Sequence, residues 1–216
     1  MDCYDTAVFD LDGTLLNTLE DLTAAVNVSL ARMGWCARSR DEVRRFVGNG
    51  VEHLIRRAVP DGTGEEETLC CLTVFKEFYA AHMTDHTAPY PGILPMLRTL
   101  RERGVAAAVV SNKFDAAVKG LCAHWFPELI QAAAGESVTA PPKPDPAMVL
   151  QALRDLDADH AGAVYVGDSD VDIQTARNAG LPCLSVTWGF RDEAFLRTRG
   201  AAVLLHRPEE LLPFFR

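Results

Sequence analysis

Polar side chains follow three apolar segments of this chain, at the point where each segment ends. Asp10 and Asp12 follow residues 6–9, a run at 111–113 follows residues 105–110, and an acidic run follows residues 163–166. Each apolar segment is typical of a buried strand. Ligands of open α/β sheets bind at the carboxyl ends of the strands, where the strand order reverses. We therefore expect these side chains to converge: Asp10, Asp12, Ser111, Asn112, Lys113, Asp168, Asp170 and Asp172.

Several carboxylates at one sheet edge repel one another, and a hard cation with oxygen ligands would offset that repulsion. Mg²⁺ fits best, because it binds through one or two carboxylates, water and a substrate phosphate. This favours a phosphate monoester as substrate. The alternative for residues 168–172 is a solvent-facing acidic first turn of a helix, where the helix dipole favours negative charge.

Transfer of a phosphoryl group also needs hydrogen-bond donors and positive charge around the phosphate oxygens. Thr14, Ser111 and Asn112 offer neutral donors, and Lys143 offers a cation. Lys143 lies in the segment 141–146, where four of six residues are proline and restrict the backbone. The alternative for Lys143 is a solvated loop lysine.

The pattern of apolar residues divides the chain into two regions. From 18 to 86 they recur at steps of three or four, which predicts helices only, with Ser39 and Glu42 as a capping box. After Pro91 and Gly92, helical and strand-like segments alternate. Strands are predicted at 6–9, 105–110, near 130–134, 163–166, 183–186 and 202–205, and helices at 93–103 and from near 146, 170 and 193. This alternation predicts an α/β core with a parallel sheet, residues 1–17 and 87–216, and a helical insertion, residues 18–86.

A turn at Gly48, Asn49 and Gly50 precedes an amphipathic segment in the helical insertion. A helix amino terminus offers free N–H groups to an anion, so the turn is a candidate contact for a substrate carboxylate. The alternative is an ordinary turn between helices.

The charge, the cysteines and the amino-terminal segment of the chain bear on which partners and which cellular location we expect. The chain of 216 residues carries a net charge of −9 with no block of basic residues, which disfavours nucleic acid. The six cysteines are scattered, and the amino terminus has no apolar stretch long enough for a signal peptide or a membrane span. We expect reduced thiols, a cytoplasmic location, no membrane partner, and a monomer or homodimer.

Four motifs together resemble the haloacid dehalogenase superfamily. They are the segment Phe9-Asp10-Leu11-Asp12-Gly13-Thr14-Leu15, the segment Val110-Ser111-Asn112-Lys113, Lys143, and the segment 166–172, in the order and spacing of that superfamily. The insertion, with the segments 46–50, 91–92, 178–180 and 188–189, is similar to the cap of the subgroup that contains phosphoglycolate phosphatases. The resemblance implies a doubly wound, Rossmann-like core with an inserted all-helical cap.

The resemblance also implies roles for individual residues. Asp10 would be the nucleophile that forms an aspartyl phosphate, and Asp12 the general acid and base. Mg²⁺ would be held by Asp10, the Asp12 backbone carbonyl and Asp168. The phosphate oxygens would be bound by Thr14, Ser111, Asn112 and Lys143. Asp172 would orient Lys143 or a metal-bound water, and Asn17, where many relatives carry Asp, has no assigned role.

The expected activity is therefore a magnesium-dependent phosphatase acting on a small phosphorylated metabolite, with 2-phosphoglycolate as first candidate. A pyrophosphatase or a sugar phosphomutase is an alternative within the same superfamily. A receiver-like signalling module, in which the aspartyl phosphate is the output, is a further alternative from another class. Asp12 and the cap both oppose it.

Overall fold

The structure is a computed structural model that describes residues 3–137 and 140–216. The chain forms two compact units. Residues 1–17 and 89–216 make up the core unit, and residues 18–88 make up the helical unit. The insertion predicted from the sequence, 18–86, ends two residues before the helical unit does.

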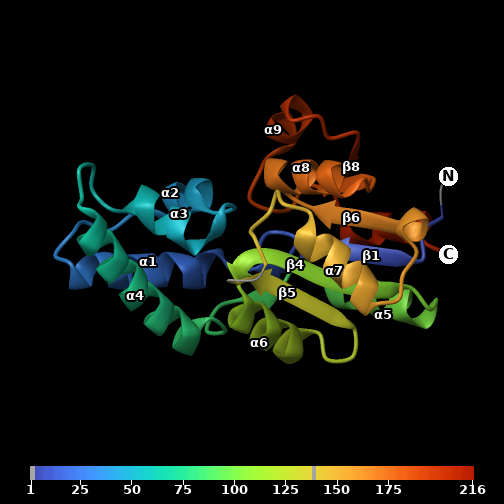
Figure 1. The fold of residues 1–216 in the computed structure, drawn as a ribbon, viewed down its shortest axis with the longest axis horizontal. Coiled ribbons are helices and arrows are strands. Elements are labelled where there is room, and N and C mark those ends of the chain that lie inside the picture. Colours follow the sequence, from blue (N-terminus) through green and yellow to red (C-terminus); the bar gives the residue numbers. More distant parts are fainter. Residues whose placement is uncertain (1–2, 138–139) are drawn as a thin grey trace. The chain divides into compact units, whose positions relative to one another are not determined.

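The core unit is built on a parallel sheet of six strands in the order β5-β4-β1-β6-β7-β8. Their bounds are β1 Thr6–Phe9, β4 Ala106–Phe114, β5 Ala132–Glu136, β6 Ala163–Gly167, β7 Cys183–Val186 and β8 Val203–Leu205. Strand order reverses at β1, because β4 and β5 extend the sheet to one side and β6, β7 and β8 to the other (Figure 1). The predicted α/β fold with a doubly wound parallel sheet is confirmed.

This reversal decides which helices cover which face. Crossovers between parallel strands are right-handed, so a change in direction along the sheet changes the face on which the connecting helix lies. The α5 and α6 crossovers run toward β5, whereas those of α7, α8 and α9 run toward β8. The helix bounds are α5 Ile93–Glu102, α6 Asp115–Trp125, α7 Ala147–Asp155, α8 Asp170–Ala179 and α9 Glu193–Thr198, with 3₁₀ turns at His160–Gly162 and Pro208–Phe214.

One face of the sheet packs against α7 and α8. Val8, Val110 and Tyr165 from three adjacent strands meet Val149 and Ala176 from these helices in one buried cluster. All four residues of β1 are buried, as expected for a central parallel strand that is covered on both faces. The central strands are thereby held firmly, and so are the polar residues at their carboxyl ends.

The helical unit contains α1 Leu19–Arg32, α2 Arg40–Phe46, α3 Gly50–Ala58 and α4 Glu65–His82. The predicted capping box of Ser39 and Glu42 opens α2. Where the chain passes between the two units, β2 Leu16–Asn17 pairs with β3 Ala88–Pro89. Among the described residues, no helix is long and apolar enough to cross a membrane.

The segment between α4 and β3 is bound by the buried carboxylate of Asp21. The backbone N–H groups of His86 and Thr87 donate to this carboxylate at 3.0 and 2.8 Å. The Asp21 side chain is 1% exposed, and the bond from Thr87 is buried while that from His86 is partly buried. They tie the end of the helical unit to the start of α1.

Two strands, β4 and β5, differ from their predicted bounds by more than one residue at an end. The strand expected near 130–134 is β5 Ala132–Glu136, because the N–H of Ile130 still bonds to the Phe126 carbonyl after α6 and pairing with β4 begins beside Gln131. β4 continues beyond Val110 to Phe114, with an irregularity in its pairing between Ser111 and Phe114. That irregularity lies within the predicted polar run.

Candidate active site

Asp10 stands at the carboxyl end of β1. Its N–H donates to the Val166 carbonyl at 2.9 Å and so extends the pairing of β1 with β6 by one residue. The chain then turns sharply, since the Leu11 carbonyl accepts the N–H of both Leu15 and Leu16. Gly13 has a φ of +93°, which a residue with a side chain adopts only with strain. The turn holds Asp10 buried, at 6% exposure, and carries Asp12 and Thr14 beside it.

Lys143 lies against Asp10, although 133 residues separate them. Its Nζ is 2.6 Å from Asp10 Oδ1 and 2.8 Å from Asp172 Oδ1, and all three side chains are buried. The loop-lysine alternative is therefore wrong. Burial lowers the pKa of Lys143, but Asp10 and Asp172 outweigh it and hold that pKa well above the ordinary value. The ammonium stays charged.

Asp172 accepts hydrogen bonds on both carboxylate oxygens. Lys143 Nζ and the Tyr165 hydroxyl, the latter at 3.0 Å, donate to Oδ1. The Ser169 N–H at 3.0 Å and its hydroxyl at 2.5 Å donate to Oδ2, as part of the capping box that opens α8. Asp172 is thus fixed by the start of its own helix and by β6. The alternative of a solvent-facing acidic turn is wrong for this residue, which is 1% exposed.

The segment that carries Lys143 is clamped by two asparagines. Asn112 donates from its amide nitrogen to the Lys143 carbonyl at 3.0 Å and accepts the Lys143 N–H on its amide oxygen at 2.6 Å. Asn178 at the end of α8 donates to the Pro144 carbonyl at 2.8 Å. The Asn112 side chain therefore positions the lysine segment, and its predicted contact with a phosphate oxygen stays a prediction.

Asp168 follows β6 and lies in a tight backbone cradle. The Phe190 N–H donates to its Oδ2 at 2.6 Å, and Thr14 Oγ1 lies 3.5 Å from its Oδ1 and 3.4 Å from Asp10 Oδ2. A Cβ on Gly13 or Gly189 would collide with the Asp168 carboxylate. Glycine at these two positions lets the backbone approach the carboxylate closely.

Asp10, Asp168 and Asp172 form a cluster of buried carboxylates whose ligand atoms all lie within 4.8 Å of one another. Burial raises the pKa of Asp168 to about 7, with a further contribution from the charge of Asp172. Burial also raises the pKa of Asp10 well above its ordinary value, against the opposing effect of Lys143. One ammonium does not offset three carboxylates, so the residues fit a divalent cation bound through oxygen.

Asp12 points to a different set of partners. Its Oδ1 is 3.2 Å from Lys113 Nζ, and Ser111 Oγ lies 3.5 Å from its Oδ2. The Asp12 side chain is 12% exposed, and it is not part of the carboxylate cluster. The site thus has one carboxylate that is separate from the three around Lys143.

The structure brings most of the predicted residues together in the core unit. Asp170, the first residue of α8, is not among the clustered carboxylates. Gly48, Asn49 and Gly50 lie in the helical unit, where Asn49 is the N-cap of α3 and Gly50 its first residue, as predicted for a turn at a helix start. Whether that turn contacts substrate stays a prediction.

Sequence reasoning missed Tyr165 and Ser169 and gave Lys113 no role. A signal existed for each. A tyrosine in a buried strand needs a partner for its hydroxyl, and Ser169 with Asp172 has the spacing of a capping box. Lys113 is the charged residue of the polar run that follows the predicted strand at 105–110.

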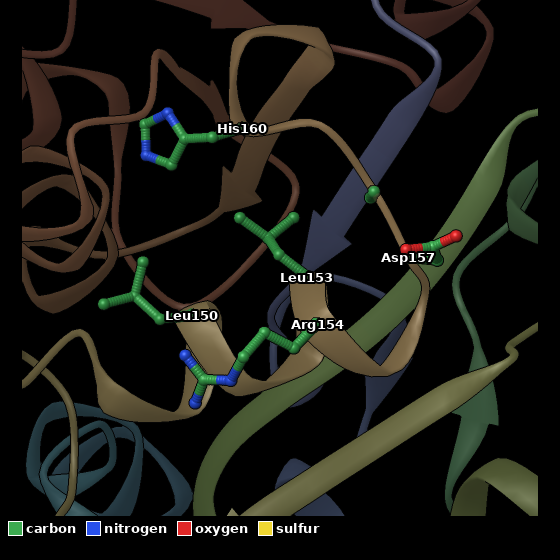
Figure 2. A pocket seen from close by; sticks show the side chains of 6 residues that line it. Leu150, Leu153, Arg154, Asp157 and His160 are labelled. Atoms are coloured by element: carbon green, nitrogen blue, oxygen red, sulfur yellow. The ribbon is translucent and has the colours of Figure 1, made fainter.

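A hollow lies away from these residues, at the end of α7. It is lined by Leu150, Leu153, Arg154, Asp157, Ala158 and His160 (Figure 2). His160 Nε2 lies 2.6 Å from the Ala179 carbonyl, so the imidazole is already engaged. None of the predicted site residues lines this hollow.

A family model described as haloacid dehalogenase-like hydrolase matches residues 7–186, a stretch that contains Asp10, Asp12, Lys143, Asp168 and Asp172 but ends before Gly189 and Phe190. The chain belongs to this family. As a haloacid dehalogenase-like hydrolase it is an enzyme. Three of the four sequence motifs lie at the carboxyl ends of β1, β4 and β6, and Lys143 lies in the loop between β5 and α7.

Relatives within this family are similar over most of their length. Phosphoglycolate phosphatase 1 of Pseudomonas aeruginosa is 35% identical over 217 residues, which cover 95% of this chain and 78% of that protein. Phosphoglycolate phosphatase of Mesorhizobium japonicum is 33% identical, over 92% of this chain and 89% of that protein. Among solved structures, a protein from Lactobacillus delbrueckii subsp. bulgaricus assigned as a phosphoglycolate phosphatase matches with a TM-score of 0.94, 35% identity and 99% of both chains. The structure of CbbY from Rhodobacter sphaeroides in complex with phosphate matches with a TM-score of 0.79, 28% identity and 96% of both chains.

Proposed function

We propose that this hydrolase is a magnesium-dependent phosphatase that acts on small phosphoric monoesters, with 2-phosphoglycolate as first candidate, through an aspartyl phosphate on Asp10. The observation that carries the proposal is the contact of Lys143 Nζ with Asp10 Oδ1 at 2.6 Å inside a cluster of three buried carboxylates. The names of the relatives at 35% and 33% identity support the candidate substrate.

In the first step, a carboxylate oxygen of Asp10 attacks phosphorus, and the bond from phosphorus to the alcohol oxygen breaks. Asp12 gives its proton to that oxygen, so the alcohol leaves neutral. In the second step, Asp12 removes a proton from water, and the water oxygen attacks phosphorus of the aspartyl phosphate. Inorganic phosphate leaves and the Asp10 carboxylate is restored. The sum is one monoester and one water converted to one alcohol and one phosphate.

The other residues hold the phosphoryl group and the charges. Lys143 and the hydroxyls of Thr14 and Ser111 would bind phosphate oxygens, while Asn112 and Asp172 would keep Lys143 in place. Asp10, Asp168 and the Asp12 backbone carbonyl would hold Mg²⁺, which when bound neutralises carboxylate and phosphate charge. The substrate would be a small metabolite and not a nucleic acid, given the net charge of −9.

The test uses purified wild-type protein with MgCl₂ and a panel that includes 2-phosphoglycolate, a hexose phosphate, pyrophosphate and p-nitrophenyl phosphate. We expect repeated turnover on the monoesters and none in Asp10→Asn, because an amide is a poor nucleophile. Preference for pyrophosphate, or transfer between sugar hydroxyls without release of phosphate, would replace the phosphatase by one of the two family alternatives. A single phosphorylation per chain without turnover would favour a signalling module.

Asp12→Asn separates the two steps. p-Nitrophenolate leaves without needing a proton, so this variant should still form the aspartyl phosphate, but it lacks the base for the second step. Intact mass spectrometry after a short incubation should find protein heavier by one phosphoryl group, with turnover lower by about 10² to 10⁴. Near wild-type turnover of Asp12→Asn would exclude Asp12 as acid and base.

A further inference from the structure

Lys113 is a second buried cation in the site, apart from Lys143. Its side chain is 2% exposed, and its Nζ lies 3.2 Å from Asp12 Oδ1. The Lys113 N–H donates to Ser111 Oγ at 3.2 Å, within the stretch of β4 where the pairing with β5 is irregular. A buried ammonium is costly unless it is paired, and this one lies beside the Asp12 carboxylate.

The proposed role of Asp12 places Lys113 on the leaving-group side of the reacting phosphorus. A general acid must come within hydrogen-bond distance of the oxygen that it protonates, and for Asp12 that oxygen belongs to the leaving alcohol. If the alcohol oxygen and Lys113 Nζ contact the same oxygen of Asp12, they lie within about two hydrogen-bond lengths, or roughly 6 Å, of each other. Lys113 therefore stands beside the leaving group, whereas Lys143 stands beside the nucleophile Asp10.

An ammonium at that place recognises negative charge on the leaving group. It carries three N–H donors and can contact two carboxylates at once, as Lys143 does with Asp10 and Asp172 in this structure. In a phosphate ester of a 2-hydroxycarboxylic acid, the carboxylate is attached to the carbon that bears the ester oxygen. It then lies one carbon away from the atom that Asp12 protonates, within reach of the same ammonium.

We propose that Lys113 is a specificity residue that binds the carboxylate of the leaving hydroxy acid while contacting Asp12. The substrate class is then phosphate monoesters of 2-hydroxycarboxylic acids, of which 2-phosphoglycolate is the smallest. This inference rests on the proposed phosphatase activity and gives its site a second anion subsite, whose proposed ligand Lys113 lies on β4 of the core unit.

The competing account is that Lys113 only positions Asp12. That account predicts an equal loss of activity on every monoester when the ammonium is removed, because each needs Asp12. Recognition of a carboxylate predicts an additional loss confined to substrates that carry one. Comparing substrates within one variant separates the two accounts, since any general damage cancels in the ratio.

The experiment measures kcat/KM for 2-phosphoglycolate and for 2-hydroxyethyl phosphate, in which a hydroxymethyl group replaces the carboxylate. Wild-type protein should prefer 2-phosphoglycolate, and Lys113→Met should reduce that preference about 10- to 100-fold, as for loss of a charge-assisted contact. Lys119→Met is the matched control, because Lys119 pairs with Asp115 on α6 and its side chain is 61% exposed. It should leave the preference unchanged. Lys113→Gln serves if the methionine variant does not fold.

Each outcome decides between the accounts. An equal loss on both substrates, or a wild-type protein with no preference for the carboxylate, would overturn carboxylate recognition while leaving the phosphatase intact. Absence of phosphate release by wild-type protein from both substrates and from p-nitrophenyl phosphate would overturn the phosphatase, and carboxylate recognition with it. As a readout independent of turnover, inhibition by glycolate should be weaker in Lys113→Met than in wild-type protein, and unchanged inhibition would count against the proposal.

Discussion

The substitution Tyr165→Phe removes a single hydroxyl group from the site and tests what that group contributes to activity. Tyr165 lies on β6 and is fully buried, and its hydroxyl is 3.0 Å from both Lys143 Nζ and Asp172 Oδ1. Phenylalanine keeps the ring that packs against α7 and α8 and removes only the oxygen. The substitution therefore tests whether the position of Lys143 depends on this hydroxyl, with little disturbance of the core.

The contacts of Lys143 set the expected size of the effect. Four acceptors surround its Nζ, namely Asp10 Oδ1, Asp172 Oδ1, the Tyr165 hydroxyl and, at 3.3 Å, the Val110 carbonyl. An ammonium has three N–H bonds, so three acceptors still satisfy it after the substitution. The remaining effect of the substitution is that Asp172 loses the hydrogen bond donated by the Tyr165 hydroxyl. Loss of a hydrogen bond to a charged group costs about 1.5–3 kcal/mol. If that cost appears in the transition state, kcat/KM falls about 10- to 150-fold.

The assay compares 2-phosphoglycolate with p-nitrophenyl phosphate. Lys143 is proposed to bind the phosphoryl group that both share, so both should lose activity by the same factor, unlike the substrate-selective loss expected for Lys113. Tyr4→Phe is the control, because Tyr4 precedes β1 at the opposite end of the sheet and should keep wild-type activity. Activity of Tyr165→Phe within twofold of wild type, or a loss on one substrate only, would refute the reasoning.

Three further predictions concern charge and the helical unit. The pKa of Asp168 is raised from 3.8 to about 7, so between these two pH values the native protein binds a proton that the unfolded chain releases. Without metal, the contribution of Asp168 to thermal stability therefore falls as the pH rises from about 4 to about 7. Adding MgCl₂ should then raise the melting temperature more at pH 8 than at pH 6, since the cation binds the deprotonated carboxylate, and an equal rise would argue against Asp168 as ligand. Burial raises the pKa of Asp21, but hydrogen bonds from Thr87 and His86 outweigh it and leave that pKa below 3.8. Asp21→Asn should cost about 1.5–3 kcal/mol of unfolding free energy at pH 7, a difference that shrinks as the pH falls below about 4; a cost independent of pH would exclude the charge as its source. Gly50 begins α3 with a φ of +86°, and Gly50→Val should lower kcat/KM for 2-phosphoglycolate more than for p-nitrophenyl phosphate if the turn binds the substrate carboxylate, whereas equal losses with an unchanged circular dichroism spectrum would remove the turn from substrate choice.

Features that depend on neighbours in the chain could be predicted from the sequence. The strands β1 and β7 have their predicted bounds, because a short and mostly apolar run is enough to define an interior strand of a parallel sheet. The capping box at Ser39 follows from two residues three positions apart. The convergence of Asp10, Thr14 and Asp168 follows from a general rule, since parallel strands end at the same edge of a sheet.

The partners of each charged side chain were decided only by the tertiary structure. Tyr165 belongs to an apolar run, and only the pairing of Val8 with Tyr165 and the packing of α8 place its hydroxyl between Lys143 and Asp172. The sequence predicts Asn112 as a phosphate ligand, and only the tertiary structure shows that its side-chain amide binds the backbone of Lys143, 31 residues away. The sequence by itself determined which residue types end each strand. Which of them pair depended on register, on crossover direction and on the close backbone approach that Gly13 and Gly189 allow, because these contacts form between segments that no local pattern relates.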